Sequence, residues 1–194
     1  MTIENAFKEL FDYLNIYMEI DTEDKKEIYK MFSYDYIKKN IYLEKKGNLT
    51  KYLYFTCSGF LQLYIEKDEE IVTTQINCPT RLITAFQSFN SEQPSVESLK
   101  AITDVCILKI TKEDFVELFH KNQKWSNATR LIYELGQIYN EQRVKNMISM
   151  TAEERYLDLL KNRPEIIHNV PVKIIASFLG IRPQSLSRIK KSIL

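Results

Sequence analysis

The stretch Val172–Lys191, VKIIASFLGIRPQSLSRIKK, decides the architecture of the C-terminal part of the chain. Its residues have the spacing of two short helices that cross over a tight turn. The small residue Ala176 is expected where the helices cross, and Gly180 at the turn, because glycine adopts a positive φ without strain. Pro183 suits the first turn of the second helix, since its φ is preset and it lacks an N–H. The stretch therefore predicts a helix-turn-helix with an inward-facing apolar set, Ile175, Leu179, Ile181, Leu186 and Ile189.

The charge around this motif indicates what the two helices could bind. Residues 171–194 hold five of the 27 basic residues of the chain and none of its 26 acidic residues, although the net charge of the whole chain is only +1. A local excess of positive charge suits a phosphate backbone. Gln184, Ser185 and Arg188 lie on the outward face of the second helix, where arginine suits guanine and glutamine suits adenine. We therefore expect DNA binding, and the alternative is a purely structural helical hairpin.

The rest of the chain divides by the period of its apolar residues. Residues 4 to about 36 have helical spacing, as do residues 112–148. Between them, residues 40–110 contain short β-rich runs spaced 8 to 12 residues apart, which predict a β-sandwich or barrel. The charged run Glu66–Glu70 is expected at a hairpin tip. Four apolar residues of the second helical zone form a stripe that could pack on the β domain or on a second copy of the chain: Ala128, Leu131, Leu135 and Ile138.

The composition of the 194 residues excludes several classes of protein. Cys57, Cys78 and Cys106 lie far apart, so we expect reduced thiols in a cytoplasmic protein, with no role assigned to them. Two histidines and no short ligand spacing make a metal site improbable. We find no signal peptide and no apolar run long enough for a membrane span. No paired-carboxylate, Ser/His/Asp or glycine-rich phosphate motif stands out, so an enzyme is not expected.

Several motifs resemble those of one family of bacterial regulators. In the β-rich zone they include Gly47 and the run Leu53–Gly59, and in the C-terminal zone Thr151–Tyr156, Ile175–Ile181 and Leu186–Ile189. On these residues the chain resembles the Crp–Fnr superfamily of transcription regulators, and in particular short members of the Bacteroidota type.

The resemblance implies an α+β fold with three parts. Residues 1–111 would form N-terminal helices and an antiparallel β-roll of the cyclic-nucleotide-binding type, a double-stranded β-helix. Residues 112–149 would form a long dimerisation helix, and residues 150–194 a helix-turn-helix DNA-binding domain. Because the chain stops at Leu194, directly after the second helix of the motif, we expect no complete wing.

The resemblance also implies function and partners. The protein would be a homodimeric regulator that binds a palindromic site on double-stranded DNA and works with RNA polymerase. Gln184, Ser185 and Arg188 would contact bases. The candidates for phosphate contacts are Lys173, Ser187, Lys190 and Lys191. The alternative is a small-molecule-binding or protein-interaction module whose helix-turn-helix is structural.

The segment that binds the cyclic phosphate in cyclic-AMP-binding relatives departs from their pattern. The expected Gly-Glu is replaced by Thr84-Ala85, and no arginine lies between Arg81 and Arg130. We therefore expect no response to cyclic AMP, and no cofactor. An unknown small molecule could bind near Gln87, Ser95 and Glu97, or the roll could be only a scaffold for dimerisation.

Overall fold

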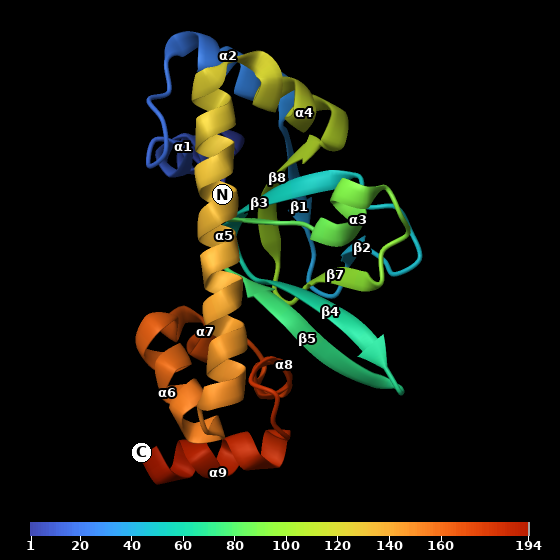
Figure 1. Ribbon diagram of the computed structural model, residues 1–194, viewed down its shortest axis with the longest axis vertical. Helices are drawn as coiled ribbons and strands as arrows, with labels where there is room; N and C mark the ends of the chain where they lie inside the picture. Colours follow the sequence, from blue (N-terminus) through green and yellow to red (C-terminus); the bar gives the residue numbers. More distant parts are fainter. Residues whose placement is uncertain (194) are drawn as a thin grey trace.

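The computed structural model describes residues 1–193, in which a β-roll lies between N-terminal helices and a group of C-terminal helices (Figure 1). The roll, named here for residues 33–111, lies beside one long helix. That helix connects it to a C-terminal domain of four short helices, residues 151–193. The helices are α1 (Ile3–Leu14), α2 (Thr22–Met31), α3 (Phe86–Ser91), α4 (Lys112–Lys121), α5 (Gln123–Ser149), α6 (Ala152–Asn162), α7 (Pro164–Asn169), α8 (Val172–Phe178) and α9 (Pro183–Ile193).

The roll consists of two four-stranded antiparallel sheets. One sheet has the order β1-β8-β3-β6 and the other the order β2-β7-β4-β5, so β5 is an edge strand. The expected sandwich or barrel, and the fold class predicted above, are thereby confirmed. The strands are β1 (Ser33–Ile37), β2 (Tyr42–Glu44), β3 (Tyr52–Ser58), β4 (Leu61–Lys67), β5 (Glu70–Asn77), β6 (Arg81–Ile83), β7 (Glu97–Ala101) and β8 (Val105–Thr111).

The charged run does lie at a hairpin tip. Strands β4 and β5 pair from Leu61 opposite Asn77 to Lys67 opposite Glu70. The two turn residues, Asp68 and Glu69, have φ values of 50° and 65°. This left-handed geometry matches the twist of a two-residue hairpin turn.

The prediction of helix from residue 4 to about 36 is wrong at its C-terminal end. Residues Ser33–Ile37 form strand β1, which pairs antiparallel with β8 from Ser33 opposite Lys109 to Ile37 opposite Val105. The segment alternates tyrosines with polar residues, a pattern that suits a strand with one covered face. Its partner strand lies some 70 residues further along the chain, so local helical spacing could not show the pairing.

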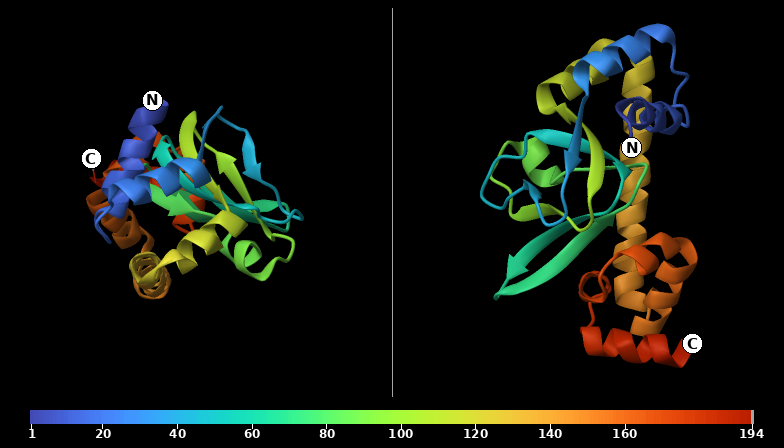
Figure 2. Two further views of the ribbon diagram at one scale, coloured as in Figure 1. Left: turned by 90° about the horizontal axis from the view of Figure 1, so that it is seen from above. Right: turned by 180° about the vertical axis from the view of Figure 1, so that it is seen from behind.

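The helix expected over residues 112–149 is interrupted at Asn122. This residue has extended backbone, with φ of −164° and ψ of 171°, and its side chain accepts a hydrogen bond from the Trp125 N–H. Asn122 therefore ends α4 and caps α5, as asparagine does at many helix N-termini. The interruption lets α4 turn away across the end of the roll while α5 runs along its side (Figure 2).

A buried carboxylate fixes the start of α5 against the N-terminal helices. Asp24 is 3% exposed and accepts a 2.9 Å hydrogen bond from the Trp125 indole N–H. It also pairs with Lys124, and it completes the capping box of α2 with the N-cap residue Asp21. A buried charge is tolerated only when it is paired and hydrogen-bonded in this way. These contacts fix the first turn of α5 against α2.

Two glycines of the roll have a positive φ but differ in the space around them, so their substitution separates backbone strain from steric overlap. Gly59 has φ of +82°, and a Cβ at this position would lie 2.3 Å from the backbone oxygen of Asp104. Gly47 has a similar φ of +87°, but nothing lies within 4 Å of a Cβ there. Gly47→Ala should therefore cost about 1–2 kcal/mol from backbone strain alone. Gly59→Ala should cost about 2–4 kcal/mol because overpacking adds to that strain.

Urea denaturation of both variants, followed by circular dichroism, measures this difference in the free energy of unfolding. Equal costs at the two positions would show that the contact with Asp104 contributes nothing.

Candidate nucleic-acid interface

Helices α8 and α9 form the predicted helix-turn-helix. Gly180 lies between them with φ of +67°, so the turn has the left-handed geometry that the sequence predicted. A Cβ on Gly180 would also approach the terminal carbon of Met147, on α5, to 2.7 Å. Pro183 is the first residue of α9, as expected for a residue without an N–H. The motif therefore has its predicted local geometry.

The predicted inward-facing residues form the core of the C-terminal domain. Ala176 and Leu186 are fully buried, and Ile175 and Leu179 are almost so, whereas Ile181 and Ile189 are partly buried against the same core. In the N-terminal part of this domain, Thr151 and Glu154 form a capping box at the start of α6. Packing of these residues fixes the orientation of α9 relative to α8.

The outward face of α9 carries most of the predicted contact residues. Gln184, Arg188 and Lys191 follow one another at intervals of four and three residues, so they share one face of the helix. All three are exposed, as are Ser185 and Ser187. The hydroxyl of Ser187 donates to the Pro183 carbonyl oxygen at 3.0 Å. Helix α9 crosses the end of the molecule at the lower edge of Figure 1, where this face meets solvent.

Two predicted phosphate contacts lie away from this face. Lys190 is half-buried, on the side of α9 that turns toward Leu186. Lys173 is exposed on α8, near its N-terminus. Arg182, which is not among the predicted contact residues, is exposed in the turn just before Pro183. Its position at the N-terminus of α9 was the available signal, because that end of the second helix of such a motif lies next to the DNA.

The C-terminal domain docks on the free edge of the roll through α8. The Ser177 hydroxyl accepts a 2.9 Å hydrogen bond from the Thr73 N–H and donates a 2.8 Å bond to the Ile71 carbonyl oxygen. One side chain thus satisfies a donor and an acceptor of edge strand β5. Four roll residues extend the apolar core of the C-terminal domain across this junction: Phe60, Ile76, Cys78 and Ile102.

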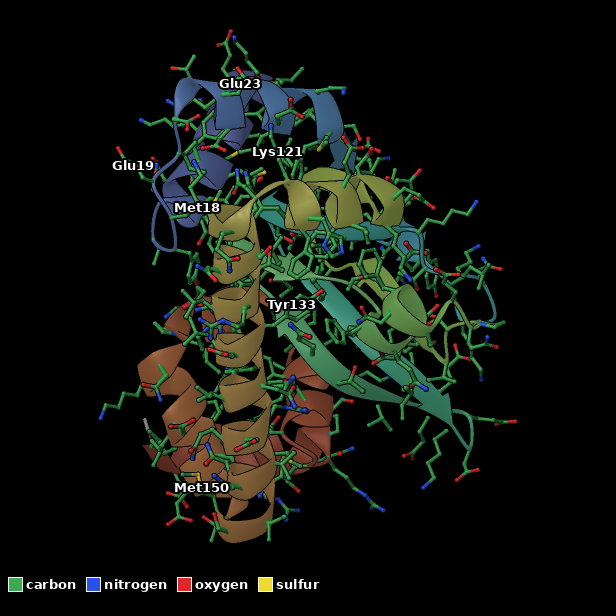
Figure 3. The ribbon with its side chains drawn as sticks, turned by 45° about the horizontal axis from the view of Figure 1, so that its top comes forward. Met18, Glu19, Glu23, Lys121, Tyr133 and Met150 are labelled. Atoms are coloured by element: carbon green, nitrogen blue, oxygen red, sulfur yellow. The ribbon has the colours of Figure 1, made fainter. Side chains whose placement is uncertain are left out.

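A cavity of about 260 Å³ lies between α5, the roll and the N-terminal helices. Its walls include Phe32, Leu53 and Trp125, and Tyr133 projects into this region from α5 (Figure 3). None of the residues that line it within the described chain is charged. Gly136 also lines it, at a point of α5 where no atom lies within 4 Å of a Cβ. The cavity is therefore suited to an uncharged, largely apolar molecule.

The three residues suggested for effector binding do not line this cavity. Gln87 is exposed on α3. Ser95 is buried, and its hydroxyl is occupied by the backbone of Glu97, to which it donates and from which it accepts. The Glu97 carboxylate accepts a 2.8 Å hydrogen bond from the Thr74 hydroxyl, and burial raises the pKa of this carboxyl. Ser95 and Glu97 are thus neighbours whose polar groups already have partners within the roll, and the role of the three residues stays a prediction.

Cys57, Cys78 and Cys106 are buried free thiols. Within residues 1–193 no group of three or more His, Cys, Asp and Glu side chains is arranged to hold a metal ion. No helix in that range combines the length and apolar character needed to cross a membrane.

Comparison with known proteins identifies one domain type and the overall fold. Residues 35–122 match the family model of the cyclic nucleotide-binding domain. The structure is similar to FixK2 from Bradyrhizobium japonicum, with a TM-score of 0.70, 13% identity and coverage of 84% of each chain. It is also similar to the c-di-GMP-responsive global regulator CLP of Xanthomonas campestris, with a TM-score of 0.65, 16% identity and coverage of 89% of this chain and 91% of that one.

A third similar structure is the catabolite activator protein of Thermus thermophilus. Its TM-score is 0.54 and its identity 17%, over 93% of this chain and 86% of that one. No curated protein sequence matches the chain. At these identities the likenesses establish the fold, which is that of the Crp/Fnr regulators: a cyclic-nucleotide-binding β-roll followed by C-terminal helices.

Proposed function

We propose that this chain, which has the fold of the Crp/Fnr regulators, is a sequence-specific DNA-binding transcription regulator that acts as a homodimer on a palindromic site. The observation that carries the proposal is the outward face of α9. It presents Gln184, Ser185 and Arg188 to solvent on a segment with five basic residues and no acidic residue. Basic side chains supply salt-dependent affinity for phosphates, and the polar side chains of α9 supply base contacts.

The proposed contacts divide between bases and phosphates. Gln184, Ser185 and Arg188 would lie in the major groove, with Arg182 at the entry of the helix. Lys173, Ser187, Lys190 and Lys191 would contact phosphates, Lys190 by extending its amine from a half-buried stem. By the same resemblance the protein would act in the cytoplasm and with RNA polymerase. Binding would need no cofactor.

Arg188→Ala should weaken binding to the preferred site by about 1–3 kcal/mol and relax the preference at one base pair. The preferred site is first obtained by selection from a randomised duplex pool with the ligand-free protein. Fluorescence anisotropy then compares the selected site with random DNA. Lys8→Ala, an exposed change in α1 at the far end of the molecule, is the control that should bind as the wild type does.

Equal losses on selected and random DNA would assign Arg188 to the phosphate backbone. If selection enriches no two-fold-symmetric site, with or without extracts of cell metabolites, the protein is a module whose helix-turn-helix is structural.

Dimerisation is supported by the way α5 divides its apolar residues. Ala128 is buried and Ile132 packs partly against the chain's own core. Leu131, Leu135 and Ile138 instead point outward and are exposed, Ile138 by 62%. These three residues follow one another at intervals of four and three, so they form one apolar row along the helix. We call this row the α5 seam, and a second copy of α5 would cover it. An exposed apolar row of this kind is uncommon on a monomer.

A parallel pair of α5 helices would place the two α9 helices at one end of the dimer. Two recognition helices on one face of B-DNA need a separation of about 34 Å to enter successive major grooves. The α5 seam and the docking of α8 on β5 together set that separation.

Ile138→Asp should convert the dimer to a monomer. A carboxylate on the seam would lose its hydration when the two helices pack together, and no cation or hydrogen-bond donor would replace the lost water. Val144→Asp is the matched control: Val144 is 56% exposed on the same helix, and at 100° per residue it lies about 120° away from Ile138. Analytical ultracentrifugation of the two variants measures the association constant. Equal effects of the two substitutions would locate the dimer seam elsewhere.

The effector of the regulator is proposed not to be cyclic AMP. The hydroxyls of Thr84 and Ser88 each donate to a backbone carbonyl, so they are not free to bind a phosphate. Among the described residues, none that lines the cavity beside α5 is charged, whereas a cyclic phosphate needs a cation. The amine of Lys100 lies 5.3 Å from the centre of the Tyr42 ring, on β2. The effector we propose is an unidentified uncharged molecule that binds in this cavity, and the alternative site is the one predicted near Gln87, Ser95 and Glu97.

Cyclic AMP at millimolar concentration should change neither the melting temperature nor the affinity for the selected DNA site. Sodium chloride at equal ionic strength is the control for screening. Calorimetric titration of cyclic AMP into the protein checks the same point directly. Saturable heat of binding would contradict the assignment.

A further inference from the structure

A second cavity, of about 500 Å³, lies where the C-terminal half of α5 meets α6 and the end of α8. Met150, at the lower end of α5 in Figure 3, is one of its lining residues. Arg81, on strand β6 of the roll, also lines it. The cavity therefore touches all three parts of the chain: the roll, the long helix and the C-terminal domain. Its volume is within the range of small-molecule sites.

The charge of the cavity wall is strongly positive. Four arginines line it, from four different elements or their ends: Arg81, Arg143, Arg155 and Arg163. Asp158 is the one acidic lining residue among those described, and its carboxylate accepts a 2.8 Å hydrogen bond from the Asn162 amide. No ion pair joins Asp158 to any of the arginines within the described chain.

Two of the four guanidinium groups are held by the protein itself. Arg155 donates to the carbonyl oxygens of Leu179 and Met150, at 3.1 and 2.6 Å. These contacts are with neutral groups, so the positive charge of Arg155 is not compensated. Arg163 forms a 3.0 Å ion pair with Glu165 and donates to the thiol sulfur of Cys78.

Arg143 is the group that the protein does not satisfy. Its guanidinium lies 4.6 Å from the centre of the Phe178 ring, and its Nε–H is buried without a hydrogen-bond partner among residues 1–193. Burial lowers the pKa of this arginine. A buried donor without a partner costs free energy, and a charged one costs more. Arg81, by contrast, is exposed at the other side of the cavity and takes part in no ion pair in the described structure.

We propose that this cavity binds a small phosphate-bearing anion, held by Arg143 and Arg81 and assisted by the charges of Arg155 and Arg163. The planar guanidinium fork matches the geometry of phosphate oxygens and binds them through paired charge-assisted hydrogen bonds. Amide side chains at the wall, Gln142 and Asn146, can bind an uncharged part of the ligand. Such a ligand would join the roll to α5 and to the C-terminal domain. The site does not depend on DNA binding, and it can be tested without DNA.

The test is calorimetric titration of the full chain with sodium pyrophosphate, against sodium chloride at equal ionic strength. We expect saturable binding by the wild-type protein. Arg143→Gln and Arg81→Gln should each weaken it by about tenfold or more, because each removes charged hydrogen bonds to the anion. Arg81 is exposed, so its substitution keeps the test valid even if Arg143→Gln fails to fold. Melting temperatures of the ligand-free variants report folding.

Two control variants separate the cavity from other basic surfaces. Arg130→Gln removes an exposed arginine of α5 that pairs with Glu134 outside the cavity, and Lys191→Gln removes a lysine of α9. Both should bind pyrophosphate as the wild type does. Absence of saturable binding, or equal binding by Arg81→Gln and the wild type, would overturn the proposal. Loss of pyrophosphate binding in Lys191→Gln alone would place the anion on α9. Citrate is titrated as an anion without phosphate, and a protein that binds citrate but not pyrophosphate would refute the assignment to phosphate.

Discussion

The hydroxyl of Ser177 makes the contact on which the position of α8, and with it α9, depends. It occupies two backbone groups of edge strand β5, the N–H of Thr73 and the carbonyl of Ile71. Without it, an exposed strand edge would carry unpaired polar groups. Because α8 and α9 share one core around Leu186, fixing α8 on the roll also fixes α9. The orientation of the outward face of α9 is therefore set by a strand that lies far from the motif in sequence.

Helix α5 performs three tasks on three faces, which explains its mixed composition. One face packs on the roll and the N-terminal helices through Trp125 and Ala128. Toward its C-terminal end, Arg143 stacks on Phe178 of α8 and Met147 approaches Gly180. The third face carries the row of Leu131, Leu135 and Ile138. A helix with only one buried face would have a continuous apolar stripe, whereas here the stripe changes partner along the helix.

The sequence predicts those features whose interacting residues lie close together along the chain. Gly180, Pro183 and the capping pair Thr151 and Glu154 act within a few residues, so the helix-turn-helix and the start of α6 were predictable. Strand β1 was missed because its pairing with β8 is distant in sequence. The break at Asn122 was missed because helical spacing continues through it. The site residues on α9 could be selected from charge and periodicity, but the arginine cavity could not, because its four arginines lie on segments that only the fold brings together.

The junction between the roll and the C-terminal domain is small enough to respond to ligands. Two hydrogen bonds through one hydroxyl contribute about 1–3 kcal/mol in total, and the apolar contact beside them adds four roll residues to the domain core. A ligand shifts such an equilibrium only by its difference in affinity for the two arrangements. An anion that contacts Arg81 of the roll together with Arg155 and Arg163 of the C-terminal domain has that difference, since separating the roll from this domain would widen its site. Linkage then requires that DNA which prefers the docked arrangement strengthen anion binding by the same factor by which the anion strengthens DNA binding.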